Sequence, residues 1–173
     1  MAPWYFTRYL KGYFHVLNIY TQNTILMKRY KKWLLFALLG TASFLNAQDW
    51  KTDFNEAKRQ AKNEKKPIIL VFQGSDWCAP CIKLDREVWS TEAFKDYAAE
   101  HYIMLQADFP RRKANALSPA QVAANTQLAE AYNPRGIFPL VVVLNETGEV
   151  LGETSYKKAS PQAYIRELND FLD

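Results

Sequence analysis

The pattern of apolar and polar residues predicts four β-strands between residues 67 and 155. Three stretches, 67–73, 102–107 and 140–144, are almost continuously apolar, which is typical of strands buried on both faces of a sheet. Asn145–Gly148 has the composition of a tight turn, and it predicts a hairpin between the third stretch and a fourth strand at 149–155.

Helices are predicted before, between and after these strands. Asp53 and Glu56 have the spacing of a capping box, and the helix that they begin ends before Pro67. Further helices are expected at about 78–89, 91–98, 118–132 and from 160 onward, the last two opening with a Ser-Pro pair. The residues expected on their apolar faces are Phe54, Ala57, Ala61, Val122, Leu128, Tyr132, Tyr164, Ile165, Leu168 and Phe171.

The order of these elements predicts the fold class. Strands separated by a helix are expected to pair in parallel through right-handed crossovers, and the last two strands are expected to form an antiparallel hairpin. We therefore expect an α/β fold, in which a central mixed sheet has helices on both faces and an extra N-terminal helix.

A different pattern precedes this domain. Basic residues at 28–32 follow Met27, an apolar run spans 33–45, and Ala47 stands where the sequence turns polar. This pattern predicts a secretory signal peptide over residues 27–47 with cleavage after Ala47, since the run is shorter than the ~18 to 20 apolar residues of a membrane span. An uncleaved N-terminal membrane anchor is the alternative. Residues 1–26 then have no role, and we interpret them as a spurious upstream extension rather than a membrane-surface segment.

Composition and charge restrict the function of the remaining chain. The 173 residues are 49% hydrophobic with a net charge of +4, but every Asp and Glu lies after position 47. Residues 48–173 thus hold 16 basic and 18 acidic residues, a net charge of −2. This composition excludes a disordered or collagen-like chain, and the charge gives no reason to expect a nucleic-acid partner.

Both cysteines stand in one C-x-x-C motif, Cys78-Ala79-Pro80-Cys81, between a predicted buried strand and a predicted helix. Residues three apart at a helix start lie close enough for a disulfide, and the free N–H groups of the helix stabilise a thiolate there. We expect Cys78 to be the more exposed cysteine and the nucleophile, and Cys81 to resolve the mixed disulfide.

Two structural alternatives are weaker. A stabilising disulfide that closes so short a loop would contribute only about 2 kcal/mol in the chain-entropy model. A structural zinc site needs about four ligands, whereas residues 48–173 offer two cysteines and His101, which we interpret as an ordinary residue at a strand end. We therefore expect no metal and no other cofactor.

These motifs resemble the thioredoxin superfamily. The resemblance rests on Asp76-Trp77 before the C-x-x-C motif, on Gly136-Ile137-Phe138-Pro139 before the third apolar stretch, and on the turn at 145–149. It covers nearly all of residues 48–173, so it implies a thioredoxin-like domain there. The chain is most similar to exported bacterial proteins related to the C-terminal domain of transmembrane thiol–disulfide interchange proteins.

The resemblance also implies a set of substrate-binding residues. By this resemblance Pro139 is a cis-proline that faces the cysteines, and Phe138 offers backbone hydrogen bonds to an extended substrate segment. Trp77 flanks the nucleophile as a contact surface. The alternatives are an ordinary proline at a strand start and a tryptophan packed in the core.

Two features depart from the family pattern. The simplest thioredoxins carry a buried Asp where this chain has Phe72, and Asp85, four residues after Cys81, is a candidate for the vacant role in proton handling. A solvated helix carboxylate is the alternative. The stretch 109–119 is longer than the minimal fold needs, and its basic segment 111–113 is either a dock for an acidic partner or a solvated loop.

The direction of the reaction also follows from the resemblance. Pro80 resembles the residue found in the reducing members, whereas oxidants and isomerases usually carry a histidine there. We therefore expect a periplasmic protein-disulfide reductase, a monomer that acts on disulfide-containing proteins and is recharged by a thiol electron donor in the membrane. A disulfide oxidase or isomerase of the same fold and a non-catalytic protein-binding module are the alternatives.

Overall fold

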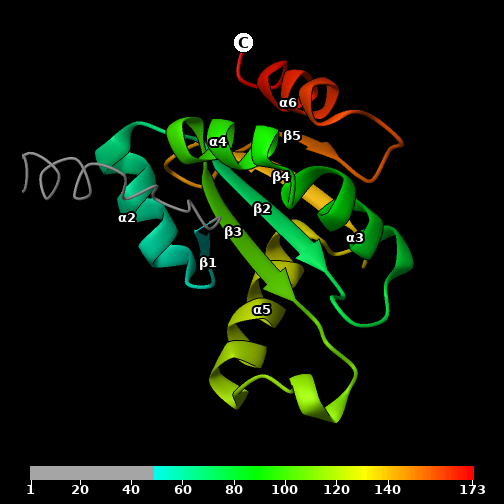
Figure 1. Ribbon diagram of the computed structural model, residues 1–173. Helices are drawn as coiled ribbons and strands as arrows, with labels where there is room; N and C mark the ends of the chain where they lie inside the picture. Colours follow the sequence, from blue (N-terminus) through cyan, green and yellow to red (C-terminus); the bar gives the residue numbers. More distant parts are fainter. Residues whose placement is uncertain (1–48) are drawn as a thin grey trace, which may run out of the picture. The chain divides into compact units, whose positions relative to one another are not determined.

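A five-stranded mixed sheet organises residues 49–173, the part of the chain that this computed structural model describes (Figure 1). The predicted signal peptide at 27–47, its cleavage site and the extension at 1–26 lie outside the described residues. Within residues 49–173, no helix combines the length and the apolar character needed to cross a membrane.

The strands are β1 (Trp50–Lys51), β2 (Ile68–Gln73), β3 (Ile103–Asp108), β4 (Leu140–Leu144) and β5 (Val150–Thr154). The helices are α2 (Phe54–Glu64), α3 (Ala79–Leu84), α4 (Glu92–His101), α5 (Pro119–Tyr132) and α6 (Pro161–Asn169). A π-helical turn, η1 (Asp85–Trp89), follows α3, and a 3-10 turn, η2 (Lys113–Asn115), lies before α5. The predicted α/β fold with an additional N-terminal helix, α2, is confirmed. His101 ends α4 rather than beginning a strand, and its exposed ring stacks on Tyr97.

Strand pairing confirms part of the expected topology. The sheet has the order β1-β3-β2-β4-β5, with β2 and β3 parallel and with β4 and β5 forming the expected antiparallel hairpin. The expectation that strands separated by a helix pair in parallel is wrong for β4, which pairs antiparallel with β2. The segment after α5 returns the chain to the end of the sheet at which β2 ends. Leu140, the first residue of β4, therefore pairs with Phe72, and β4 runs antiparallel to β2. The two-residue β1, parallel to β3, was not predicted.

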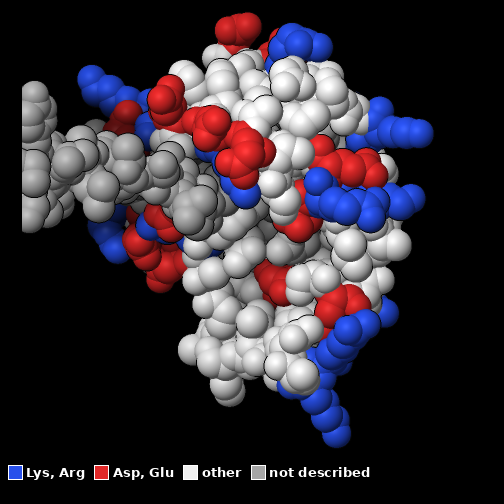
Figure 2. Space-filling model, viewed as in Figure 1, with Lys and Arg blue, Asp and Glu red and all other residues white. Residues whose placement is uncertain are grey.

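Two apolar layers cover the sheet, one on each face. Side chains that alternate along β2 point to opposite layers: Ile69 and Val71 to the layer of α4 and α6, and Leu70 and Phe72 to the layer of α2 and α5. All four are at most 1% exposed. The sheet is therefore buried on both faces, as its continuously apolar strands predict. On the face that Figure 2 shows, charged side chains of both signs are interspersed.

The helix starts follow the capping signals in the sequence. Asp53, Ser118 and Ser160 each accept a hydrogen bond from the backbone N–H three residues later. The expectation that Val122 faces the core is wrong, because that side chain is 49% exposed. The first turns of α5 extend past the ends of β2 and β3 (Figure 1), and the first buried residue of this helix is Asn125.

The helix expected at 78–89 is interrupted by the π turn η1. Its wider winding appears in the hydrogen bond from Ser90 N to Asp85 O, at 2.7 Å across five residues. Leu84, Val88 and Trp89 are all buried on one side of this segment. Trp89 packs edge-on against Trp50, Phe94 and Tyr164, so the π turn directs an additional large side chain into the core.

Candidate active site

The C-x-x-C motif lies where β2 leaves the sheet and α3 begins. The turn 74–77 is closed by a hydrogen bond from Cys78 N to Gly74 O at 2.9 Å. Cys78 is the N-cap of α3 and is disulfide-bonded to Cys81, with their Cα atoms 5.2 Å apart. This separation lies in the usual range for a disulfide.

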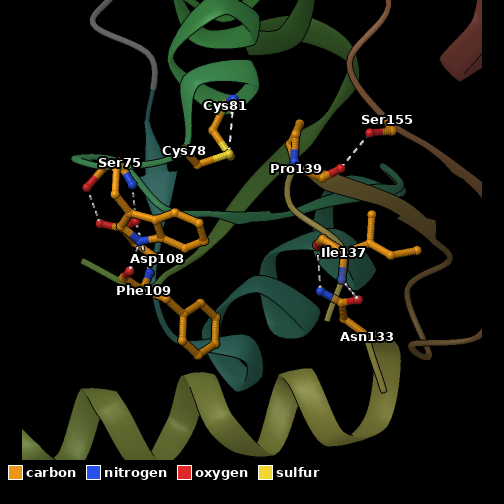
Figure 3. The surroundings of a disulfide bond; sticks show 10 residues. Ser75, Cys78, Cys81, Asp108, Phe109, Asn133, Ile137, Pro139 and Ser155 are labelled. Atoms are coloured by element: carbon orange, nitrogen blue, oxygen red, sulfur yellow. Dashed lines mark hydrogen bonds between the residues drawn. A yellow bond between two sulfur atoms is a disulfide. The ribbon is translucent and has the colours of Figure 1, made fainter. Parts of the chain in front are cut away.

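The two cysteines differ in their place on the helix more than in their exposure. Cys78 is 4% exposed and Cys81 3%, so exposure does not distinguish a nucleophile as the sequence analysis expected. Cys78 Sγ accepts a hydrogen bond from Cys81 N at 3.2 Å (Figure 3). After reduction, a thiolate at Cys78 would meet this N–H and the positive end of the helix dipole, both of which lower a thiol pKa.

Trp77 packs flat against the turn that precedes the cysteines. A Cβ atom on Gly74 would lie 2.3 Å from the indole ring, so only glycine leaves room for the ring there. The indole Nε1 donates to Phe109 O at 2.7 Å, and the ring centroid lies 5.5 Å from that of Phe138. Trp77 is half-buried, and its ring links the cysteine turn to the segment before Pro139.

The Phe138–Pro139 peptide bond is cis, in accordance with the resemblance. Pro139 directly precedes Leu140, whose pairing with Phe72 sets it beside the end of β2, from which the cysteine turn leaves. Figure 3 shows Pro139 on the same side of the sheet end as the disulfide. Among residues 49–173, no backbone hydrogen bond involves the N–H or C=O of Phe138.

Two residues that the sequence analysis missed hold this segment from either end. Asn133 is 3% exposed, and its amide both accepts from Ile137 N and donates to Ile137 O, each at 2.9 Å. Ser155 Oγ donates to Pro139 O at 2.6 Å. The turn signal Asn133-Pro134 was available in the sequence, whereas nothing local connects Ser155 with Pro139.

Asp85 lies on the helical segment after Cys81 with its side chain exposed. Its carboxylate accepts a hydrogen bond from Ser90 Oγ at 3.2 Å, at the other end of η1. Cys81 is buried. Phe72, at the position of the family's buried Asp, is fully buried in the apolar layer of α2 and α5. A role of Asp85 in proton handling stays a prediction. No group of three or more His, Cys, Asp or Glu within residues 49–173 is arranged to hold a metal ion.

Two aspartates, also missed, tie the loop after β3 to the cysteine turn. Asp108 accepts from Ser75 N at 2.9 Å and from Ser75 Oγ at 2.6 Å (Figure 3). Asp76 accepts from the backbone N–H groups of Arg111 and Arg112, both at 2.9 Å. These bonds, above all the one from the Arg111 N–H, lower the pKa of Asp76 below its ordinary value of 3.8.

A disulfide at the N-terminus of a helix, beside a cis-proline that directly precedes a central strand, defines a thiol–disulfide oxidoreductase with the thioredoxin fold. The chain belongs to the Thioredoxin-like family, whose family model matches residues 49–146. Among individual relatives, the disulfide bond reductase DsbH of Chlamydia pneumoniae is 32% identical over 119 residues, which make up 69% of this chain and 70% of DsbH.

Solved structures agree with this assignment. A structure described as DsbH oxidoreductase has a TM-score of 0.66 at 31% identity, over 72% of this chain and 83% of its own. A disulphide isomerase from Xylella fastidiosa Temecula1 has a TM-score of 0.52 at 24% identity, over 69% of this chain and 88% of its own, a likeness of fold alone. The thioredoxin-related protein DsbJ of Chlamydia pneumoniae is 24% identical over 61% of this chain but only 33% of DsbJ.

Proposed function

We propose that this protein is an exported, periplasmic protein-disulfide reductase in which Cys78 is the nucleophile and Cys81 the resolving thiol. One observation carries the proposal: Cys78 Sγ caps α3 and accepts the Cys81 N–H, an arrangement that stabilises a thiolate at Cys78 after reduction. The relation to a protein named as a disulfide bond reductase supports the reducing direction. Pro80, directly before Cys81, supports it as well.

The reaction consumes a dithiol and produces a disulfide. The Cys78 thiolate attacks one sulfur of the substrate disulfide, forms a mixed disulfide and displaces the other substrate sulfur, which takes up a proton. Cys81 then loses its proton and attacks Cys78 Sγ, which breaks the bond to the substrate and releases the second substrate thiolate, and this thiolate also takes up a proton. The substrate gains two electrons and two protons, and the protein is left with the Cys78–Cys81 disulfide.

The substrate is held beside the cysteines by the segment around Pro139. The Phe138 N–H and C=O, which have no backbone partner within residues 49–173, are available to an extended chain in a short piece of strand addition. Trp77 provides an apolar wall next to Cys78. An exported protein is separated from cytosolic reductases, so the oxidised form is recharged by a thiol electron donor in the membrane.

The reduction potential of the Cys78–Cys81 pair tests the direction. Equilibration of the purified protein with glutathione or dithiothreitol is expected to give a value near the −270 mV of thioredoxin, about 150 mV below the −120 mV of the strongest oxidants. A value near the oxidants' would replace the reductase with an oxidase or isomerase at the same site.

Trapping experiments test the roles of the two cysteines. Cys81→Ser is expected to accumulate a mixed disulfide with a peptide substrate, because the thiol that resolves it is missing. Cys78→Ser is expected to accumulate none. Equal trapping by both variants would contradict the assignment, and a disulfide that stays unreduced under native conditions would leave only a structural role.

A further inference from the structure

The loop between β3 and α5 is attached to the active-site turn by several bonds. Asp76 immediately precedes Trp77. Its carboxylate accepts hydrogen bonds from the backbone N–H groups of Arg111 and Arg112 and from Asn115 Nδ2, each at 2.9 Å. Phe109 N donates to Gln73 O at 2.9 Å, at the end of β2. The loop is therefore a fixed part of the surface around the cysteines.

One basic side chain of this loop lies directly on the active-site tryptophan. The guanidinium carbon of Arg111 is 3.7 Å from the centroid of the Trp77 ring, a close cation–π contact. Trp77 also donates its Nε1–H to Phe109 O, so ring and loop hold each other. The charge of Arg111 is thus fixed against the residue that precedes Cys78.

In the described part of the chain, the basic side chains of the loop form no salt bridge with the acidic side chains near them. Arg111, Arg112 and Lys113 are exposed, and no salt bridge within residues 49–173 involves any of them. The carboxylates of Asp76 and Asp108 accept hydrogen bonds from backbone N–H groups and from Ser75 and Asn115. The charge of Arg112 also helps to lower the pKa of Asp76, without a salt bridge between the two side chains. In Figure 2, Lys and Arg side chains project from the lower right edge, where Figure 1 has this loop.

We infer that residues 111–113 form a basic rim that selects, among disulfide substrates, those with Asp or Glu in the segment next to the reacting cysteine. This inference rests on the proposed reductase function and adds a substrate class to it. An extended chain held at Phe138 passes close to Trp77, whose ring lies 5.5 Å from that of Phe138, and Arg111 covers Trp77. Carboxylates on that chain meet the guanidinium of Arg111, which Trp77 holds in position, and the exposed charges of Arg112 and Lys113, whereas lysines there are repelled.

A pair of matched peptides tests the inference. Two short peptides with the same disulfide, one flanked by Asp and Glu and one by Ser and Gln, are each reduced by the dithiol form of the protein, and second-order rate constants are measured at low salt. We expect a roughly three- to tenfold preference for the acidic peptide, the effect of about two exposed ion pairs. The preference should shrink at about 1 M salt, where the screening length falls to about 3 Å.

Charge-matched variants locate the effect. Arg111→Gln with Arg112→Gln is expected to reduce the preference to less than twofold, while Arg59→Gln with Lys62→Gln, which removes the same charge from the exposed side of α2, keeps it. Both Arg111 and Arg112 bind Asp76 through backbone N–H groups that the substitutions retain, and circular dichroism checks that the variants fold.

The outcomes separate the two proposals. Equal rates for both peptides in the unmodified protein would overturn the basic rim and leave the reductase intact. A preference lost equally in both double variants would also overturn it, since the selectivity would then follow net charge. Failure to reduce either peptide would instead refute the proposed function.

Discussion

Replacing Asn133 with alanine is expected to lower the free energy of unfolding by about 2 to 3 kcal/mol. The variant removes two hydrogen bonds of 2.9 Å and leaves both the N–H and the C=O of Ile137 without these partners. An unsatisfied buried polar group costs about 1 to 3 kcal/mol. Ile137 is half-buried, so water can partly replace the lost hydrogen bonds. We therefore expect the N–H and the C=O of Ile137 each to contribute a cost near the lower end of that range.

Urea unfolding of the oxidised protein measures this loss. With an m-value of about 1 to 3 kcal/mol per M, the midpoint is expected to fall by about 0.7 to 3 M. Gln127→Ala, an exposed position on the same helix, is the control and should change stability by no more than about 0.5 kcal/mol. If Asn133→Ala unfolds at the urea concentration of the unmodified protein, its amide does not hold the segment before Pro139 and our account of that loop is wrong.

Three further changes test other parts of the structure. Gly74→Ala places a methyl group 2.3 Å from the Trp77 ring, so the ring must move, which should alter tryptophan fluorescence and cost about 1 to 3 kcal/mol in urea unfolding; an unchanged spectrum would contradict the packing. The lowered pKa of Asp76 means that its carboxylate stabilises the fold above the ordinary pKa of 3.8 and loses this effect as pH falls through the lower folded value. Hydrogen exchange of the 111–112 amides should therefore quicken in acid relative to other loops, and Asp76→Asn should expose them already at neutral pH; protection that is indifferent to both changes would rule out the Asp76 attachment. Leu105→Ala, at a fully buried position, should lower the free energy of unfolding by about 2 to 5 kcal/mol, whereas Leu151→Ala, 41% exposed, should change it by about 0.5 kcal/mol or less; similar losses in both would contradict the assignment of the core.

Features encoded by neighbouring residues were predictable from the sequence. The buried strands, the capped helix starts and the cysteine pair each depend on a few adjacent side chains, and all are found in the structure. The cis peptide before Pro139 came from the resemblance, because no local pattern distinguishes it from an ordinary proline at a strand start.

Features that depend on where the chain returns in space were not predictable. A helix can bring the following strand back at either end of a sheet, and so β4 was assigned the wrong direction relative to β2. Asp76 meets Arg112 from 36 positions away, and Ser155 meets Pro139 from 16, so neither contact has a local signature. The burial of Asn125 in place of Val122 likewise depends on how far α5 extends past the sheet.

The π turn between Cys81 and Trp89 sets the orientation of the disulfide as well as its distance from the core. Each residue of an α-helix turns the chain by about 100°, so one residue more or less between these two positions rotates one of them around the axis relative to the other. Trp89 is locked among Trp50, Phe94 and Tyr164, so the cysteines would be the part that swings. A single deletion in residues 85–89 would keep the C-x-x-C motif itself intact but turn it away from Pro139.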